Sequence, residues 1–194
     1  MTTELVHQPT RERLTHRKAP LEEFRALPES VLPVEYIDGE IIMAPSPVVA
    51  HQIILGNIYF ALRSFVEEKK GGRVFCAPLD VELPTGEVVQ PDVFILTNEE
   101  TAAASSGKYV KAVPFSAVEV LSPGSVKHDA ITKRKLYESN GVGEYWIVAP
   151  ETRTISQLIL REGHYVLTEL SETDTLKSAV LSGFEANADR FFTI

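Results

Sequence analysis

The chain of 194 residues has little of several things that would mark other classes of protein. It contains one cysteine, Cys76, so an intramolecular disulfide is excluded, and this fits a reducing compartment such as the cytoplasm. No stretch approaches the roughly 18 uncharged apolar residues that span a bilayer, and residues 1–20 lack the apolar core of a secretory signal. The chain is also poor in positive charge: it has 19 Lys and Arg and 27 Asp and Glu, which gives a net charge of -8. That balance argues against a protein that coats nucleic acid through bulk positive charge, but not against an enzyme that brings a cation to its substrate.

The composition that is present fits one folded domain. Apolar residues make up 44% of the chain, which is ordinary for a globular protein of this length. Residues 1–19 carry many charges and little apolar pattern, so we expect a flexible leader there and a single domain over 20–194.

Apolar spacing and turn residues predict an α/β domain with a mixed central sheet flanked by helices and with extra β-hairpins towards both ends. A tail at 179–192 is amphipathic and should pack on the domain. The elements expected in chain order are a short helix at 20–27, a hairpin at 35–43, a helix from Ser46 (N-cap) and Pro47 to about Lys70, a strand at 74–83 paired with a strand at 88–96, a flexible loop at 97–113, a buried central strand at 115–121, a helix at 125–139, a strand at 144–148 and a closing hairpin at 154–170.

Two carboxylates, Glu119 and Asp92, lie in or next to apolar strands, where burial of a charged group is unfavourable. Glu119 lies inside the apolar run 115–121, where an ionised group must be paired or bound to a metal, although it could also be satisfied by a hydrogen bond or point outward at an edge. Asp92 follows Pro91 at the start of a neighbouring strand; alone, this Pro-Asp pair says little. Together the two could bridge a divalent ion, and oxygen ligands with open water positions suit Mg²⁺ or Mn²⁺.

The helix that follows Glu119 carries a second set of polar residues. Asp129, Lys133 and Tyr137 are each four residues apart and therefore share one face, whereas Lys135 points elsewhere. The plain interpretation is an ordinary i,i+4 ion pair with Tyr137 as a packing residue. The alternative is that Lys133 reaches back over the end of the Glu119 strand.

Two further residues are secondary candidates. His51 falls on the buried stripe of the helix at 46–70, where it is either a satisfied core histidine or a group that hydrogen-bonds a carboxylate or helps to bind metal. Glu40 is either a solvated hairpin residue or a further carboxylate of the site.

The αβββαβ order of elements from 46 to 149, with Pro91-Asp92 and Glu119, resembles the PD-(D/E)XK nuclease superfamily, whose fold is restriction endonuclease-like. A finer resemblance, over roughly residues 20 to 192, is to the Uma2 family of restriction endonuclease-like proteins. The motifs that carry it are Glu35-Tyr36-Ile37-Asp38-Gly39-Glu40, Ser46-Pro47 with His51-Gln52, Pro91-Asp92-Val93, Val118-Glu119-Val120-Leu121-Ser122-Pro123, then Asp129, Lys133 and Tyr137, and Gly141-Val142-Gly143-Glu144-Tyr145-Trp146-Ile147-Val148.

The resemblance implies a metal-dependent endonuclease that hydrolyses phosphodiester bonds in nucleic acid, DNA in the first place. Asp92 and Glu119 would hold Mg²⁺ or Mn²⁺. The superfamily pattern has a lysine two residues after the acidic residue, where this chain has Leu121, and the resemblance implies that Lys133 replaces it. The alternative is an inactive relative that binds nucleic acid or a partner protein. A homodimer is a further expectation, because many single-domain nucleases pair to cut two strands.

Overall fold

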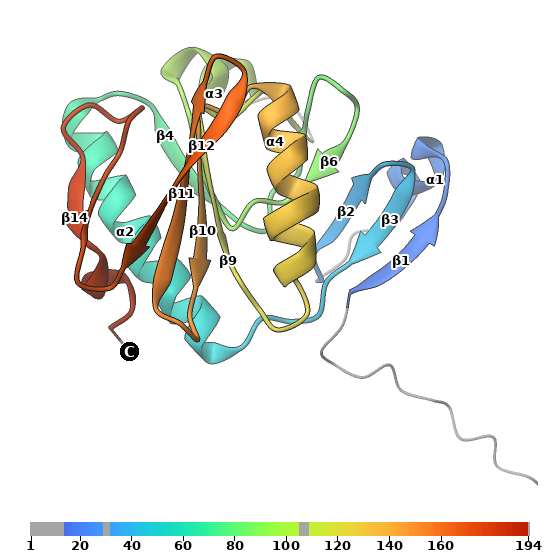
Figure 1. The fold of residues 1–194 in the computed structure, drawn as a ribbon. Coiled ribbons are helices and arrows are strands. Elements are labelled where there is room, and N and C mark those ends of the chain that lie inside the picture. The colour runs from blue at the N-terminus through green and yellow to red at the C-terminus, as the bar shows by residue number, and fades with distance from the viewer. Residues whose placement is uncertain (1–13, 29–31, 105–108, 194) are drawn as a thin grey trace, which may run out of the picture.

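The computed structural model describes residues 14–28, 32–104 and 109–193. Within them the chain forms two six-stranded sheets, a small strand pair and helices on both faces of the second, central sheet (Figure 1). No helix among these residues is long and apolar enough to cross a membrane.

The central sheet carries the αβββαβ core. Its strands are antiparallel except for the parallel pair β9–β10. In spatial order they are β12 (His164–Ser171), β11 (Thr154–Arg161), β10 (Glu144–Ala149), β9 (Ser116–Val120), β7 (Val93–Leu96) and β4 (Arg73–Cys76). Helix α2 (Val49–Lys69) covers one face, and the π-helical turn η1 (His128–Lys133) with α4 (Arg134–Asn140) covers the other (Figure 1). The restriction endonuclease-like fold class predicted from the sequence is confirmed by this arrangement.

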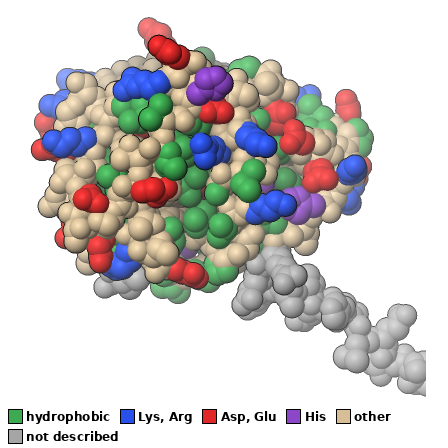
Figure 2. Space-filling model, viewed as in Figure 1, with side chains coloured by type: hydrophobic (Ala, Val, Ile, Leu, Met, Phe, Trp, Pro, Cys, Tyr) green, Lys and Arg blue, Asp and Glu red, His purple; other side chains and the backbone are tan. Residues whose placement is uncertain are grey.

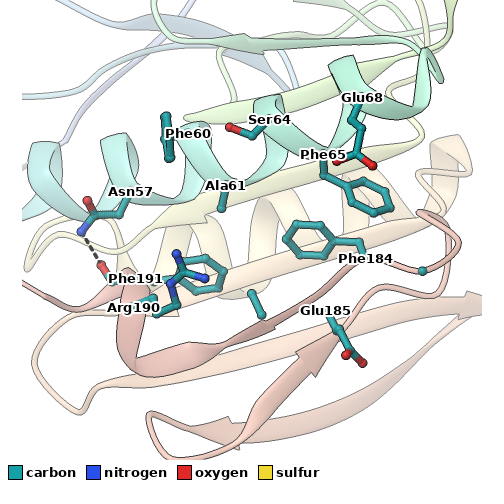
Figure 3. A pocket seen from close by; sticks show the side chains of 12 residues that line it. Asn57, Phe60, Ala61, Ser64, Phe65, Glu68, Phe184, Glu185, Arg190 and Phe191 are labelled. Carbon is teal, nitrogen blue, oxygen red and sulfur yellow. Dashed lines mark hydrogen bonds between the residues drawn. The ribbon is translucent and has the colours of Figure 1, made fainter.

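The main core lies between α2 and the sheet, and the C-terminal segment closes it. Apolar side chains at helical spacing on α2, from Ile54 to Val66, pack against alternate residues of the central strands. The strand pair β13 (Thr175–Lys177) and β14 (Glu185–Asn187), with the 3₁₀ turn η2 (Ala188–Phe191), lies beside α2. Figure 3 shows Phe65 and Phe184 in contact across this seam and Asn57 donating to the carbonyl of Phe191 at 3.2 Å. The predicted packing of the 179–192 tail is therefore confirmed.

The N-terminal sheet lies on the α4 side of the molecule (Figure 1). Its strands in spatial order are β1 (Thr15–Lys18), β3 (Glu40–Met43), β2 (Val34–Ile37), β6 (Val88–Val89), β5 (Val81–Glu82) and β8 (Val110–Lys111). The short helix α1 (Leu21–Arg25) buries Phe24 against this sheet. Alternation on β2 turns Ile37, and with it Glu35, towards the side where α4 packs.

Several predicted boundaries were wrong. The strand expected at 74–83 is two strands, β4 and β5, in different sheets, because Pro78 between them has no N–H to donate to a ladder. The same holds for 88–96, which Pro91 divides into β6 and β7.

Three other expectations also need correction. Helix α2 begins at Val49 with Val48 as N-cap and no side-chain cap, not at Ser46 and Pro47, because the fixed φ of proline suits an extended chain as well as a helix. The expected loop at 97–113 contains α3 (Asn98–Ala104) and β8, while 105–108 lie outside the described residues. Of the expected leader, residues 1–13 also lie outside them, but Thr15–Lys18 form β1, whose exposed side chains give no apolar signal.

Candidate active site

Asp92 and Glu119 lie near one another at one end of the central sheet. Strand β7 begins at Val93, opposite Val118 of the antiparallel strand β9, so Asp92 directly precedes the paired residues and Glu119 directly follows Val118. Asp92 is bonded by His51 of α2, and Glu119 is bonded by Lys133 of the π-helical turn, so the two side chains are held by helices on opposite faces of the sheet. The charge of Asp92 nevertheless acts on Glu119 and raises its pKa.

The carboxylate of Asp92 is held in place from two sides. Its Oδ2 accepts the backbone N–H of Val120 at 2.7 Å and lies 3.1 Å from His51 Nε2. Burial alone would lower the pKa of His51, but the hydrogen bond and the charge of Asp92 outweigh burial and raise it. His51 therefore orients Asp92, and its other ring nitrogen, Nδ1, is buried without a hydrogen-bond partner among the described residues.

Lys133 is the centre of a buried ion cluster. Its ammonium nitrogen lies 2.8 Å from Oε1 of Glu119, 2.8 Å from Oε1 of Glu35 and 3.6 Å from Oδ1 of Asp129. Its side chain is only 5% exposed. A surface ion pair is thereby excluded, and the predicted reach of Lys133 over the Glu119 strand is what the structure has.

Glu35 from the N-terminal sheet is the carboxylate that sequence reasoning missed. It was noted only as part of a motif, whereas its Oε2 lies 2.7 Å from His128 Nε2 and its Oε1 also accepts the N–H of Gln90 at 2.8 Å. A signal existed, because Glu35 is two residues from Ile37 and must share its buried face. Glu40, the acid nominated instead, bonds His16 Nδ1 at 3.2 Å and does not contact Lys133.

The π-helical turn explains why His128 was also missed. In an α-helix, residues five apart are about 140° from one another around the axis, so His128 and Lys133 would diverge. The turn from His128 to Lys133 instead follows the wider π spacing, and His128, Asp129 and Lys133 are all buried. Such turns are frequent at functional sites.

Burial and the neighbouring charges together set the pKa values of the groups in the ion cluster. Burial raises the pKa of Glu119 well above its usual value; Lys133 opposes this, and the neighbouring acids Asp129, Asp92 and Glu35 add to it. Burial would likewise raise the pKa of Glu35, but Lys133, His128 and the Gln90 N–H lower it to about 2. Lys133 stays protonated: burial works against its charge, yet Glu119, Glu35 and Asp129 raise its pKa well above the usual value. It acts as a fixed cation rather than as a base.

Tyr137 and Asp129 join the cluster as supporting groups. The Tyr137 hydroxyl donates to Glu119 Oε1 at 3.1 Å, so this residue does more than pack. Tyr145 donates to the backbone carbonyl of Asp129 at 3.1 Å, which ties the π-helical turn to β10. The helical face predicted for Asp129, Lys133 and Tyr137 is the buried one, and Lys135 is exposed.

A nuclease should show a basic strip near Asp92, and the candidates in the sequence are Lys108, Lys111, Lys127, Lys133 and Arg134. Figure 2 shows Lys and Arg scattered among acidic and hydrophobic side chains on the α4 side of the molecule. Lys111 lies 3.4 Å from Glu82, Lys133 is buried, and Lys108 lies outside the described residues. On this face, any attraction for a polyanion must therefore be local.

Asp92 and Glu119 are the candidate ligands of a divalent ion. Among the described residues, no group of three or more His, Cys, Asp or Glu side chains is arranged to hold a metal. Asp92 and Glu119 nevertheless use one oxygen each in the hydrogen bonds above, and within the described residues Oδ1 of Asp92 and Oε2 of Glu119 accept none. Two carboxylates with a free oxygen each suit Mg²⁺, which keeps several waters and is bound by one or two carboxylates together with substrate phosphates.

Comparisons with known proteins give the family of the chain and agree with its fold. Residues 21–189 match the model of the Uma2 family, whose description is "Putative restriction endonuclease". The fold is similar to that of a crystal structure described as a putative nuclease belonging to DUF820 from Anabaena variabilis ATCC 29413, with a TM-score of 0.79 and 20% identity over 90% of this chain and 97% of the other. No curated protein matches the chain.

Proposed function

We propose that this chain, which belongs to the Uma2 family, is a metal-dependent nuclease that hydrolyses phosphodiester bonds in nucleic acid. One observation carries the proposal: the Lys133 ammonium lies 2.8 Å from Glu119, and the Asp92 carboxylate accepts the N–H of Val120, the residue after Glu119. Two neighbouring carboxylates and a fixed cation suit a reaction at a phosphate.

The residues divide the work as follows. Asp92 and Glu119 would hold the ion, Mg²⁺ or Mn²⁺. A bound divalent ion supplies polarisation of the phosphate and a lowered pKa for a bound water. Lys133, as a permanent cation, stabilises negative charge that develops on the phosphate oxygens. Its position is fixed by Glu35 and Asp129 on one side and Glu119 on the other.

His51 and Tyr137 act as positioning residues in this proposal. His51 holds Asp92, and Tyr137 holds Oε1 of Glu119, so the free oxygen of each carboxylate keeps one orientation. DNA as the first substrate, a cytoplasmic location and a homodimer are parts of the same proposal.

A second candidate is a catalytically inactive module that binds nucleic acid or a protein partner. It is favoured by the ion cluster itself, because Lys133 already balances Glu119 without any metal. Apolar exposure near this cluster points the same way: Val126 and Ile131, at the start of the helix that covers the site, are 48% and 47% exposed. Figure 2 shows hydrophobic side chains gathered near the middle of that face.

One experiment separates the two candidates. Purified protein is incubated with single- and double-stranded DNA and RNA in Mg²⁺, in Mn²⁺ or in EDTA, and products are resolved on a denaturing gel. A nuclease gives metal-dependent cleavage that Asp92→Asn abolishes. Asp38→Asn is the matched control, because Asp38 is an exposed turn residue in the left-handed conformation that asparagine tolerates.

Wild type and Asp92→Asn must first show the same thermal unfolding transition, so that lost cleavage is not lost folding. Cleavage that persists in Asp92→Asn would assign the activity to a contaminant. Binding without cleavage of any of the four substrates would favour the inactive module.

A further inference from the structure

A surface cavity lies next to the ion cluster on the side of the N-terminal sheet. Its volume is about 580 Å³, and it opens between β1 and the segment that leads from β9 into the π-helical turn. Its polar lining consists of His16, Lys127, His128 and Thr132, and the other described lining residues are Leu14, Pro123 and Gly124. No carboxylate is among them, although Asp and Glu outnumber Lys and Arg in the chain by 27 to 19.

Each histidine of the cavity is held by a carboxylate that bonds one of its ring nitrogens. His128 Nε2 lies 2.7 Å from Glu35, and His16 Nδ1 lies 3.2 Å from Glu40. Among the described residues no hydrogen bond uses the second ring nitrogen of either one. The two rings meet edge to face with centroids 6.4 Å apart. An imidazole that donates one N–H to a carboxylate presents a second N–H to an anion when the ring is protonated, and the neighbouring carboxylate favours that protonated form.

The remaining polar groups of the cavity suit the same ligand. The ammonium of Lys127 is a flexible point charge, and the Thr132 hydroxyl can donate. Phosphate oxygens accept such hydrogen bonds, and in protein–DNA complexes half to two-thirds of all hydrogen bonds go to phosphate and sugar. A metal cation finds no carboxylate or thiolate in this lining.

A short chain of contacts links the cavity to the candidate active site. His128 lines the cavity and contacts Glu35, and Glu35 contacts Lys133. In the proposed reaction Lys133 stabilises charge on the attacked phosphate, so a neighbouring phosphate of the same strand would lie on the cavity side of these contacts.

We propose that the cavity lined by His16, Lys127, His128 and Thr132 binds a backbone phosphate of the nucleic-acid strand, next to the one that is cleaved. This rests on the proposed function only for the register between the two phosphates. The binding itself requires no chemistry at Asp92 or Glu119. It also explains how an acidic protein without a broad basic strip can hold a polyanion.

The test is a salt titration of binding, made in EDTA so that no cleavage occurs. A fluorescent 12-nucleotide single strand is titrated with wild type and with Lys127→Ala between 50 and 200 mM NaCl, and Kd is measured by anisotropy. Each phosphate contact to a single strand contributes about -0.7 to the slope of log affinity against log salt. The salt concentration rises fourfold over this range, and four to the power 0.7 is about 2.6. The affinity of wild type should therefore fall about 2.6-fold more than the affinity of Lys127→Ala.

Lys135→Ala is the matched control, because Lys135 is exposed on the same helical segment but does not line the cavity. Its slope should equal that of wild type, whereas His16→Ala should weaken binding together with Lys127→Ala. Competition with inorganic phosphate at constant ionic strength distinguishes a strand phosphate from a free one: the free anion should displace the oligonucleotide only weakly.

Equal slopes for wild type, Lys127→Ala and Lys135→Ala overturn the proposal, as does a wild type that binds no oligonucleotide. If Lys127→Ala loses binding while wild type never cleaves nucleic acid, the proposed phosphate site is supported and the proposed nuclease activity is refuted. The two proposals therefore fail separately.

Discussion

Replacing Lys133 with methionine tests the ion cluster most directly. Methionine has similar length and flexibility but no charge, so Glu35, Glu119 and Asp129 would be left around an apolar side chain. An exposed i,i+4 pair would cost about 0.3–0.5 kcal/mol. The side chain of Lys133 is 5% exposed, however, and breaking a buried pair costs about 3–5 kcal/mol.

We therefore expect Lys133→Met to lower the free energy of unfolding by about 4 kcal/mol at pH 7. Urea denaturation measures this as a fall in the midpoint of roughly 1.3–2 M, for a slope of about 2–3 kcal/mol per molar. Because native domains have only about 5–15 kcal/mol in total, the variant should be folded but fragile. Activity lost in this variant must accordingly be corrected for its folded fraction.

The same reasoning fixes a pH dependence and a control. Removing Lys133 raises the pKa values of the carboxylates it faced, so the variant binds protons more readily in the folded state than wild type does. The deficit should therefore shrink as the pH falls from 7 towards 5. Lys135→Met, at the exposed neighbour, should stay within about 0.5 kcal/mol of wild type. A cost below 1 kcal/mol for Lys133→Met, unchanged with pH, would refute the buried cluster.

Three further outcomes are expected. Mg²⁺ or Mn²⁺ at ten times its Kd should stabilise wild type by about 1.4 kcal/mol, a rise in Tm of roughly 3–6 °C by thermal shift, but not Glu119→Ala; equal shifts would place the ion elsewhere. The pKa of Glu35 is about 2 in the folded state and 4.5 in the unfolded chain, so ionised Glu35 contributes about 3 kcal/mol to the free energy of unfolding above pH 4.5. This contribution is lost as the pH falls towards 2. Glu35→Gln should therefore flatten the acid limb of a curve of stability against pH. Glu144 accepts bonds from Trp146 Nε1 and from backbone N–H groups of the C-terminal segment, so Glu144→Ala should cost roughly 3 kcal/mol in urea, whereas the exposed Glu151→Ala should cost almost nothing.

The parts of the site that the sequence predicted follow from spacing along the chain. Glu119 in an apolar strand is costly unless it has partners, and the i,i+4 spacing of Asp129, Lys133 and Tyr137 keeps them on one face even though the first two lie in the π-helical turn. The proximity of Asp92 and Glu119 needed a prediction of strand neighbours, which the αβββαβ order supplied.

The parts that the sequence did not predict depend on irregular or distant structure. Glu35 reaches Lys133 only because the N-terminal sheet packs against the π-helical turn, and no local pattern encodes that contact. His128 is hidden by the π spacing, which a periodicity of 3.6 residues cannot show. Glu35 and Glu40 lie on one hairpin, and its register puts Glu40 opposite Ile37, on the same face as Glu35. Strand pairing therefore does not separate them; their partners do, because Glu40 bonds His16 of β1 whereas Glu35 bonds His128 and Lys133.

The displaced lysine has a physical consequence for how the site works. A lysine at position 121 would approach Glu119 along its own strand, but that position is Leu121, which packs in the apolar core beneath α4. Lys133 instead comes from the covering helix, and there it must be held by additional carboxylates, Glu35 and Asp129, or its burial would drive off its proton. Those carboxylates in turn raise the pKa of Glu119. A divalent ion beside Glu119 would oppose that effect and release a proton on binding, so metal affinity should rise with pH. In the proposed site, a lysine from the helix in place of one from the strand would therefore couple metal binding to the whole buried cluster, including the sheet that contributes Glu35.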